Sequence, residues 1–256
     1  MNLEQKISLE DQRKIYREEI YPIAPSYREV IIDNDDVITD SFEKLEQLGI
    51  FLLKFPSESS NLSGFHIKKS NIDCIYINTN TTLGRQYFSC WHEYYHAITG
   101  EGSGISFFDK SSTDKIECKA NLFAGYILMP ENLIEGFIKS RNIDINNLTY
   151  ENIIDMQHYF NVSYKAVIKR LQIIYGRINN EKILYELSSF DKPFELTNYT
   201  IKMGYSTELL CKTNEVYIPQ KFFDDLNANV RNKRINEAKK KSIDDFLEYI
   251  RYVKKR

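Results

Sequence analysis

The stretch Trp91-His92-Glu93-Tyr94-Tyr95-His96 contains the pattern His-Glu-x-x-His inside a run whose apolar residues recur every three or four positions. That spacing predicts a helix over residues 82 to 99, and the following Gly100 is a residue type that ends helices. With four histidines in 256 residues, the pattern has a chance expectation of roughly 0.01 occurrences. We therefore take this helix as the element around which the fold is arranged.

A helix places residues four positions apart one above the other, so the imidazoles of His92 and His96 can share one metal ion. Zinc accepts such nitrogen ligands at roughly 2.0 to 2.1 Å in a tetrahedral arrangement. Glu93 points about 100° away from His92 around the helix. Its carboxylate is therefore placed to take a proton from water rather than to bind the ion. A hydrolytic zinc site needs a third protein ligand and an open fourth position.

Several residues downstream of this helix are candidates for the third ligand. The metzincin pattern would place a histidine six residues after His96, but that residue is Gly102. The remaining histidines, His66 and His158, stand at no standard offset. Acidic residues follow the helix at four positions: Glu101, Asp109, Asp114 and Glu117.

Glu117 is the favoured third ligand because it lies on the next predicted helix, over residues 113 to 129. In the gluzincin arrangement, a helix with two histidines is followed by a turn and by a second helix that carries a glutamate. Asn121 lies one turn beyond Glu117 and could hydrogen-bond the second nitrogen of a ligand histidine. One zinc ion is expected, although manganese or another divalent metal would leave the same sequence pattern.

The segments around this helix pair predict an α+β fold. Apolar residues at helical spacing predict helices over residues 7 to 22 and 35 to 48. Three apolar runs predict a small antiparallel sheet or meander, at residues 50 to 56, 64 to 67 and 74 to 78. Further helices are predicted after Pro130, over residues 131 to 140, 149 to 160 and 163 to 175. The last two resemble a helix-turn-helix. Beyond Gly176, strand-like pieces and a charged helix predict a small α/β segment, over residues 183 to 187, 197 to 203, 209 to 218 and 232 to 254.

The charge balance argues against a nucleic-acid partner. Lys and Arg total 34 and Asp and Glu total 36, which gives a net charge of −2, whereas nucleic-acid binding normally shows as a basic excess. The second helix of the helix-turn-helix-like pair carries Lys165, Lys169 and Arg170, which could meet phosphates. The basic C-terminal run is interleaved with acidic residues and predicts a solvated amphipathic helix. Direct nucleic-acid binding is therefore not expected.

The cysteines and the apolar segments predict a cytoplasmic protein. The four cysteines are far apart and form no C-x-x-C pair, which indicates free thiols in a reducing compartment. Cys90 and Cys118 flank the metal motif and are expected to be small buried hydrophobes. The first residues lack the apolar core of a signal peptide, and no apolar stretch approaches the roughly 20 residues of a membrane span.

Other side chains near the motif could contact a substrate. His66 lies in a predicted strand whose alternation could direct it into the cleft as an oxyanion or substrate contact. Tyr94, Tyr95 and Tyr126 could each stabilise a tetrahedral intermediate. A sheet-surface position for the histidine and ordinary packing for the tyrosines are the favoured interpretations.

These residues together resemble the ImmA/IrrE family of metallopeptidases, over roughly residues 35 to 178. The most specific part is the run Ile116-Glu117-x-x-Ala120-Asn121-x-Phe123-Ala124-x-x-Ile127-Leu128-Met129-Pro130, which follows His92-Glu93-x-x-His96. Further matching segments are Leu62-Ser63-Gly64-Phe65, Ile75-Tyr76-Ile77-Asn78, Arg85-Gln86-x-Phe88 and the stretch from Phe160-Asn161-Val162-Ser163 to Arg170-Leu171.

The resemblance implies a zinc-dependent endopeptidase in which His92, His96 and Glu117 hold the metal and Glu93 activates water. Members of that family typically cut or inactivate a helix-turn-helix repressor, often encoded beside them in phages, mobile elements or stress-response loci. The expected regions are an N-terminal helical extension, a zinc metallopeptidase domain, a helix-turn-helix-like region and a C-terminal segment of unknown role, over residues 1–34, 35–140, 141–178 and 179–256.

Two departures from the family pattern leave a second function open. Tyr95 stands where the family usually has a small residue, and residues 179 to 256 match no known part of the family. Both could restrict the cleft, as expected of a non-proteolytic or weakly proteolytic regulator, antirepressor-like or antitoxin-like, with a mainly structural metal. A third possibility is a DNA-binding regulator that uses residues 149 to 175 and the basic tail.

Overall fold

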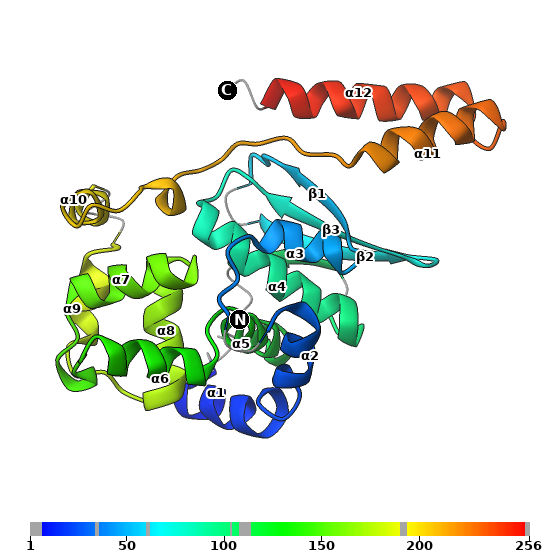
Figure 1. The fold of residues 1–256 in the computed structure, drawn as a ribbon. Helices are drawn as coiled ribbons and strands as arrows, with labels where there is room; N and C mark the ends of the chain where they lie inside the picture. The colour runs from blue at the N-terminus through cyan, green and yellow to red at the C-terminus, as the bar shows by residue number, and fades with distance from the viewer. Residues whose placement is uncertain are drawn as a thin grey trace, which may run out of the picture.

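The computed structural model describes residues 7–33, 36–59, 62–102, 104–107, 114–189 and 194–253. Most of the helices lie on one side of a four-stranded sheet, and a helical hairpin near the C-terminus extends on the other side (Figure 1). This arrangement confirms the predicted α+β class. The buried hydrophobic side chains form one core that reaches from Tyr16 near the N-terminus to Leu209.

The sheet has the order β1-β3-β2-β4, with β1 at Phe51–Phe55, β2 at Leu62–Lys69, β3 at Ile72–Asn78 and β4 at Gly104–Phe107. β2 runs antiparallel to both of its neighbours, but β1 runs parallel to β3. The prediction of a purely antiparallel sheet is therefore wrong for β1. The side chain of Asn78 bonds Ser57 N and Leu62 O, which holds the β1–β2 connection across the end of β3.

α4 (Leu83–Thr99) and α5 (Lys115–Leu128) form the centre of the molecule. α4 packs against β2 and β3 on one side and against α5 on the other (Figure 1). It ends at Gly100 with φ of 68°, as predicted, because the left-handed conformation suits glycine. α3 (Ser41–Gln47) is joined to α4 by a hydrogen bond from Trp91 Nε1 to Ser41 Oγ.

The N-terminal helices belong to the core. α1 (Leu9–Ile15) continues into the π-helical turn η1 (Tyr16–Ile20), so one helical segment covers most of the predicted range 7 to 22. α2 (Ala24–Ile31) follows it and was not predicted. Arg28 on α2 is buried and donates from Nε to Ile127 O on α5. This bond joins the N-terminal helices to the helix that carries Glu117.

α6 (Glu131–Ser140) precedes the helix-turn-helix-like region, which consists of the short 3-10 helix η3 (Ile145–Asn147), α7 (Tyr150–Phe160) and α8 (Tyr164–Tyr175). Ser163 caps α8 by accepting from Ala166 N, as predicted. The turn between α7 and α8 lies directly against the start of α4. A Cβ atom on Gly84 would be 2.9 Å from the carbonyl carbon and oxygen of Val162, so a side chain there would separate the two parts.

The C-terminal part is helical, with α9 (Glu181–Glu186), α10 (Glu195–Lys202), the 3-10 helix η4 (Glu208–Leu210), α11 (Gln220–Arg231) and α12 (Glu237–Val253). The predicted α/β character of this segment is therefore wrong. The buried Leu184 and Leu187 are three residues apart and face the core from a helical segment, not from a strand. The predicted strand at 209–218 begins inside η4, and its residues 211–218 form an extended strap with isolated bridges to Lys54 and Thr82.

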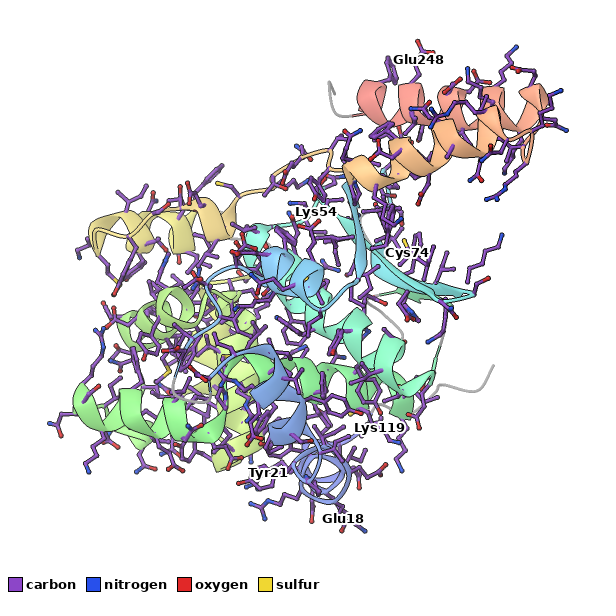
Figure 2. All side chains as sticks on the ribbon, turned by 45° about the vertical axis from the view of Figure 1, so that its right-hand side comes forward. Glu18, Tyr21, Lys54, Cys74, Lys119 and Glu248 are labelled. Atoms are coloured by element: carbon purple, nitrogen blue, oxygen red, sulfur yellow. The ribbon has the colours of Figure 1, made fainter. Side chains whose placement is uncertain are left out.

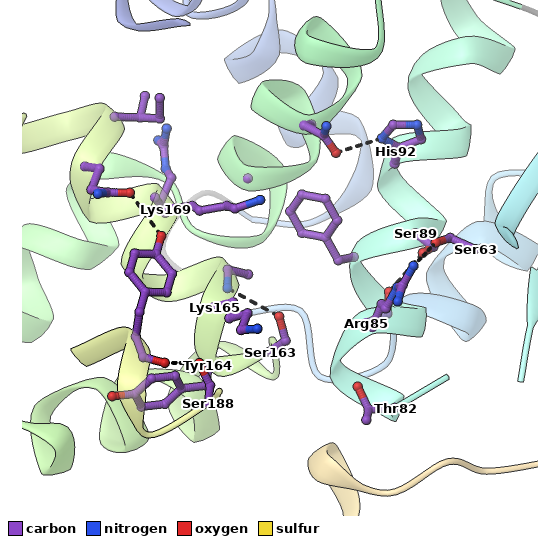
Figure 3. A pocket seen from close by; sticks show the side chains of 18 of the residues that line it. Ser63, Thr82, Arg85, Ser89, His92, Ser163, Tyr164, Lys165, Lys169 and Ser188 are labelled. Atoms are coloured by element: carbon purple, nitrogen blue, oxygen red, sulfur yellow. Dashed lines mark hydrogen bonds between the residues drawn. The ribbon is translucent and has the colours of Figure 1, made fainter. Parts of the chain in front are cut away.

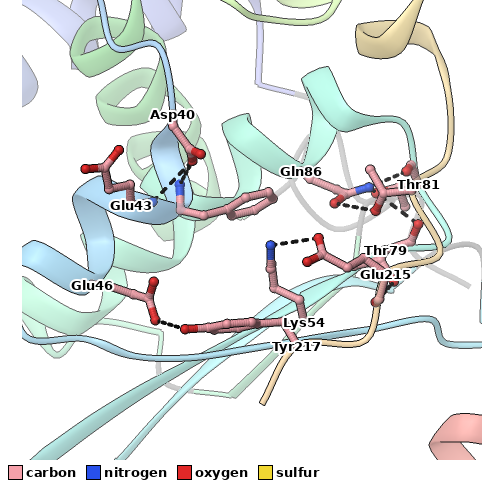
Figure 4. A network of polar contacts seen from close by, with 11 residues as sticks. Asp40, Glu43, Glu46, Lys54, Thr79, Thr81, Gln86, Glu215 and Tyr217 are labelled. Carbon is pink, nitrogen blue, oxygen red and sulfur yellow. Dashed lines mark hydrogen bonds and ion pairs between the residues drawn. The ribbon is translucent and has the colours of Figure 1, made fainter. Parts of the chain in front are cut away.

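This strap, residues 211–218, ties the C-terminal part to the sheet (Figure 4). Lys54 on β1 is buried and pairs with Glu215 at 2.9 Å. The backbones of Lys54 and Tyr217 exchange two hydrogen bonds, and Leu83 N at the start of α4 donates to Cys211 O. The strap therefore covers the exposed edge of β1 and fixes the residues that follow α10 near the beginning of α4.

α11 and α12 form a hairpin that extends beyond the sheet (Figure 2). Its contact with the body includes the rings of Phe246 and Phe55, whose centroids lie 5.7 Å apart. The predicted helix over residues 232 to 254 corresponds to α12, which begins at Glu237, and α11 precedes it as a separate helix. In the described parts of the chain, no helix combines the length and the apolar character needed to cross a membrane.

Candidate metal centre

Three side chains from α4 and α5 converge on one point. His92 Nε2 lies 3.2 Å from His96 Nε2 and 3.2 Å from Glu117 Oε2, and His96 Nε2 lies 3.5 Å from Glu117 Oε1. Both histidines are buried, and Glu117 is half-buried. Among the described residues, this is the group of three whose donor atoms could hold a metal ion. It is the same set that the sequence predicted.

The local structure explains why these side chains meet. His92 and His96 are one turn apart on α4 and present their rings to the same side. Gly100 lets the chain leave α4, and α5 starts at Lys115 after the N-cap Asp114, whose side chain accepts from Ile116 N. Glu117 therefore lies in the first turn of α5, next to the last two turns of α4.

The second ring nitrogen of each histidine has a defined partner. His92 Nδ1 lies 3.0 Å from Asn121 Oδ1, and His96 Nδ1 lies 2.7 Å from Glu101 O. A carbonyl oxygen can only accept, so in the neutral form of each ring Nδ1 carries the proton and Nε2 presents a lone pair to the convergence point. Such partners hold ligand histidines in the orientation and tautomer that a metal requires.

The donor set fits a tetrahedral divalent cation. Ligands bound at roughly 2.0 to 2.1 Å with tetrahedral angles are about 3.3 to 3.4 Å apart, close to the three distances given above. Two imidazole lone pairs and a carboxylate at this spacing repel one another, and a cation between them removes that repulsion. The set therefore suits a divalent metal in both geometry and charge.

The charges at the centre act differently on the two rings. Burial lowers the pKa of His92, but the carboxylates of Glu117 and Glu93 outweigh burial and raise the pKa above its usual range. Burial and the neighbouring His92 lower the pKa of His96. At neutral pH, His96 is therefore neutral and a ready nitrogen ligand.

Glu93 is fully buried and lies between α4 and the sheet. It faces Gly64 on β2, where a Cβ atom would be 3.2 Å from Glu93 Cγ and 3.3 Å from Glu93 Oε1. Gly64 therefore provides the space that this carboxylate occupies. Glu93 is not part of the three-residue donor group, but it lines the same cavity as His92 and Glu117.

The metal centre opens into a cavity of about 1120 Å³ between α4, α5 and α8 (Figure 3). α4 contributes Arg85, Phe88 and His92, and α8 contributes Lys165 and Lys169. The residues after Gly176 form another part of the wall. The volume is above the roughly 300 to 1,000 Å³ typical of small-molecule sites, so the cavity can take a segment of a larger molecule.

The weaker substrate-contact candidates lie elsewhere. Tyr95 is buried, donates from its hydroxyl to Glu101 Oε2 at 3.0 Å and packs against the rings of His96 and Phe123. Tyr126 contacts Tyr21 and Arg170. Neither of these described side chains lines the cavity.

His66 and Tyr94 are also removed from the cavity wall. His66 is buried in β2, and its Nε2 lies 2.9 Å from Asp73 Oδ1. Tyr94 packs its ring against Trp91, with the centroids 5.7 Å apart. Neither side chain lines the cavity, although His66 is close enough to His96 to contribute to the lowering of its pKa.

Two of the alternative third ligands have other roles. The side chain of Glu101 accepts from Tyr95, and Asp114 caps α5. Asp109 lies outside the described residues.

The two cysteines that flank the site are buried, as predicted. Burial raises the pKa of Cys118 to about 11, so this thiol is protonated at neutral pH. Both residues therefore serve as small apolar groups in the packing of α4 and α5.

The basic residues of the helix-turn-helix-like pair do not form one solvent-facing row. Arg170 is 3% exposed and donates to Met129 O and to Tyr16 Oη, so the expectation that it could meet phosphates is wrong. Lys165 and Lys169 are exposed on α8, but they line the cavity that contains the metal centre. α8, the second helix of the pair, thus faces the cavity that contains the metal centre.

Sequence reasoning missed two residues close to the centre. A Cβ atom on Gly102 would be 3.0 Å from the ring of His96, so the absence of a side chain here leaves room for that ring. Arg85 lines the cavity and donates to Ser63 Oγ at 2.7 Å. It lies two helical turns before His92, so helical spacing alone could have placed it on the same face.

Comparison with known proteins gives one family. The family model of the IrrE N-terminal-like domain, of peptidase type M78, matches residues 45–172. This range contains α4, α5, α7 and most of α8. No curated protein matches the chain.

Proposed function

The chain belongs to the IrrE N-terminal-like family of peptidases, and on that premise we propose that it is a zinc-dependent endopeptidase acting on a protein substrate. The observation that carries the proposal is the convergence of His92, His96 and Glu117 at tetrahedral spacing beside the buried Glu93. These three residues would hold the ion. Glu93 would be the catalytic base.

A zinc ion in this position supplies Lewis-acid polarisation of a carbonyl group and lowers the pKa of water. Glu93 takes a proton from the attacking water and returns it to the amine that leaves as the peptide bond breaks. The neighbouring Gly64 leaves room for this carboxylate. Asn121 and Glu101 O hold the two imidazoles, so that the donor atoms stay in place during the reaction.

The cavity supports hydrolysis over a purely structural metal. Structural zinc sites are usually closed by four protein ligands, whereas the group found in the described residues has three, with the cavity beside them. Tyr95 does not line the cavity, and described residues of the C-terminal part form one of its walls. We therefore favour the peptidase over a regulator that only binds.

We further propose that the substrate is a helix-turn-helix repressor. Support comes from the resemblance of the sequence to the ImmA/IrrE family and from a cavity large enough for a polypeptide segment. Direct binding of nucleic acid by this chain is not part of the proposal, because Arg170 is buried and the exposed lysines of α8 line the cavity.

The function is tested with the zinc-loaded protein and a helix-turn-helix protein encoded beside it. We expect Glu93→Gln to keep one bound zinc ion and to lose cleavage by at least about 10²-fold. His92→Ala and Glu117→Gln should lose both metal and cleavage. Glu135→Gln, on the exposed surface of α6, is the matched control and should behave as the unmodified protein. Cleavage by Glu93→Gln at the unmodified rate would contradict the mechanism.

A further inference from the structure

The wall of the cavity carries an excess of positive charge. Apart from the metal ligands, the neighbouring Glu93 and the internally bonded Arg170, its charged lining residues in the described chain are four cations and one carboxylate: Arg85, Lys165, Lys169, Arg177 and Glu181. The whole chain has a net charge of −2. The overall composition therefore does not explain a cationic wall.

Two of these cations are placed to act together on α8. Lys165 and Lys169 are four residues apart, which puts them on one face of the helix. Both are exposed, and Figure 3 shows Lys169 directed from α8 across the cavity toward α4. Arg177 follows shortly after the end of α8 and is also exposed. This side of the cavity thus carries two ammonium groups and a guanidinium in its wall.

Arg85 carries positive charge on the opposite side, close to the metal centre. It lies on α4 two turns before His92, and its bond to Ser63 Oγ fixes the guanidinium at the cavity wall. A segment that reaches the metal centre therefore passes between Arg85 and the lysines of α8. Complementary charge along such a path favours one class of partner and repels the opposite class.

From this placement we propose that the site selects a polypeptide segment with aspartate or glutamate side chains close to the scissile bond, held by Lys165 and Lys169. The inference rests on the proposed function, because it assigns the substrate of the same metal centre. A polypeptide fits better than a nucleic acid, since apolar side chains such as Phe88, Leu122 and Ile173 line the cavity together with the cations. The segment would combine acidic residues with apolar ones.

The C-terminal part of the chain takes part in this selection. Leu187, Leu209 and Leu210 line the cavity and lie outside the range that matches the family model. Part of the cavity wall is therefore built by residues beyond the range that the family model matches.

The test measures binding separately from cleavage. The probes are three pools of fluorescein-labelled twelve-residue peptides that share their apolar residues and differ in carrying Asp and Glu, Ser and Asn, or Lys and Arg. Each pool is titrated with the full-length, zinc-loaded Glu93→Gln protein at low ionic strength, and anisotropy is recorded. We expect the acidic pool to bind at least about tenfold more tightly than the neutral pool. The basic pool should bind most weakly.

Charge reversal on α8 tests the residues. Lys165→Glu/Lys169→Glu should reduce the preference for the acidic pool to below about twofold. Lys239→Glu/Lys241→Glu, on α12 outside the cavity, changes the total charge equally and should keep the preference. Lys165→Ala/Lys169→Ala gives the same test without new charges, and thermal melting checks that each variant is folded.

Equal binding of the three pools, or an acidic preference that survives both α8 variants, would overturn the inference. Tighter binding of a labelled single-stranded oligonucleotide than of the acidic pool, lost in the α8 variants, would assign the cavity to nucleic acid instead. The proposed function fails on a different result. In that case the unmodified protein binds the acidic pool but cleaves neither the pool nor the neighbouring helix-turn-helix protein.

Discussion

The two ligand histidines differ in the residue that fixes each ring. The Nδ1 atom of His96 bonds a backbone carbonyl, which no substitution removes, whereas His92 depends on the side chain of Asn121. Asn121 is one turn beyond Glu117 on α5, so a single helix supplies a ligand and the support of another ligand. At the scale of single residues, replacement of Asn121 can therefore change the orientation of the His92 ring without removing a metal ligand.

Replacement of Asn121 tests this role. Asn121→Ala leaves the three donors in place but frees the ring of His92, so the zinc affinity should fall by about 10- to 100-fold. Asn121→Asp keeps an acceptor and should retain most of the affinity. Competition with a chromogenic chelator measures the change. Asn227→Ala, on the exposed face of α11, is the control, and an unchanged affinity in Asn121→Ala would show that this bond does not orient the ligand.

At the scale of elements, the contact between β2 and α4 determines where Glu93 lies. Gly64 is in the interior of β2, and its missing side chain lets the strand approach α4 closely. A Cβ atom there would be 2.6 Å from Tyr76 O on β3 as well as 3.2 Å from Glu93 Cγ. Neither the backbone of β3 nor the buried carboxylate can move away easily, so the strand or the helix must shift.

Gly64→Ala should therefore reduce both stability and activity. We expect the free energy of unfolding to fall by about 1 to 3 kcal/mol and cleavage to fall more than zinc content, because Glu93 is displaced and the ligands are not. Urea titration and metal analysis give the two quantities. Gly136→Ala, in the open interior of α6, has no atom within 4 Å of its new Cβ and should raise stability by about 0.5 to 1 kcal/mol. A Gly64→Ala protein as stable and active as the unmodified one would refute this packing argument.

Local sequence patterns predicted the elements that depend on local rules. The helix of the His-Glu-x-x-His motif and its end at Gly100 follow from apolar spacing and from the freedom of glycine. The parallel pairing of β1 with β3 could not be predicted, because it depends on a connection held by Asn78 rather than on the strands themselves.

The errors in the C-terminal part have a similar cause. Short apolar runs such as residues 183 to 187 suit a strand or a helix equally, and packing against the core decides between them. The burial of Arg170 was also invisible in the sequence, because its partners Met129 and Tyr16 are far away along the chain. The placement of His92, His96 and Glu117 together agrees with the sequence, since two adjacent helices carry all three.

At the scale of the whole molecule, Arg170 joins three regions of the chain. It extends from α8, donates from Nε to Met129 O after α5 and from Nη2 to Tyr16 Oη of the N-terminal helices, and lies over the ring of Tyr16. Burial raises the pKa of Tyr16 far above its usual range although Arg170 opposes the rise, so the hydroxyl stays protonated and donates to Glu131. One buried cation on α8 thus joins the helix-turn-helix-like region to the end of α5 and to the N-terminal helices.

Arg170→Met should destabilise the entire fold. The substitution leaves Met129 O without this donor, removes one bond from Tyr16 and keeps the side-chain volume, so the free energy of unfolding should fall by about 2 to 4 kcal/mol. Guanidinium titration followed by circular dichroism should show one cooperative transition at lower denaturant. Lys139→Met, on the exposed face of α6, should change stability by less than about 0.5 kcal/mol. A separate early transition in Arg170→Met would mean that the regions fold independently.

The central claim is that His92, His96 and Glu117 hold one catalytic zinc ion while Glu93 stays outside its ligand set. Anomalous diffraction at the zinc edge from crystals of the zinc-loaded protein tests it most directly. We predict a single peak at about 2.0 to 2.2 Å from His92 Nε2, His96 Nε2 and a carboxylate oxygen of Glu117, with no fourth protein ligand. No peak between these three side chains, or a peak bonded to Glu93, would contradict the account.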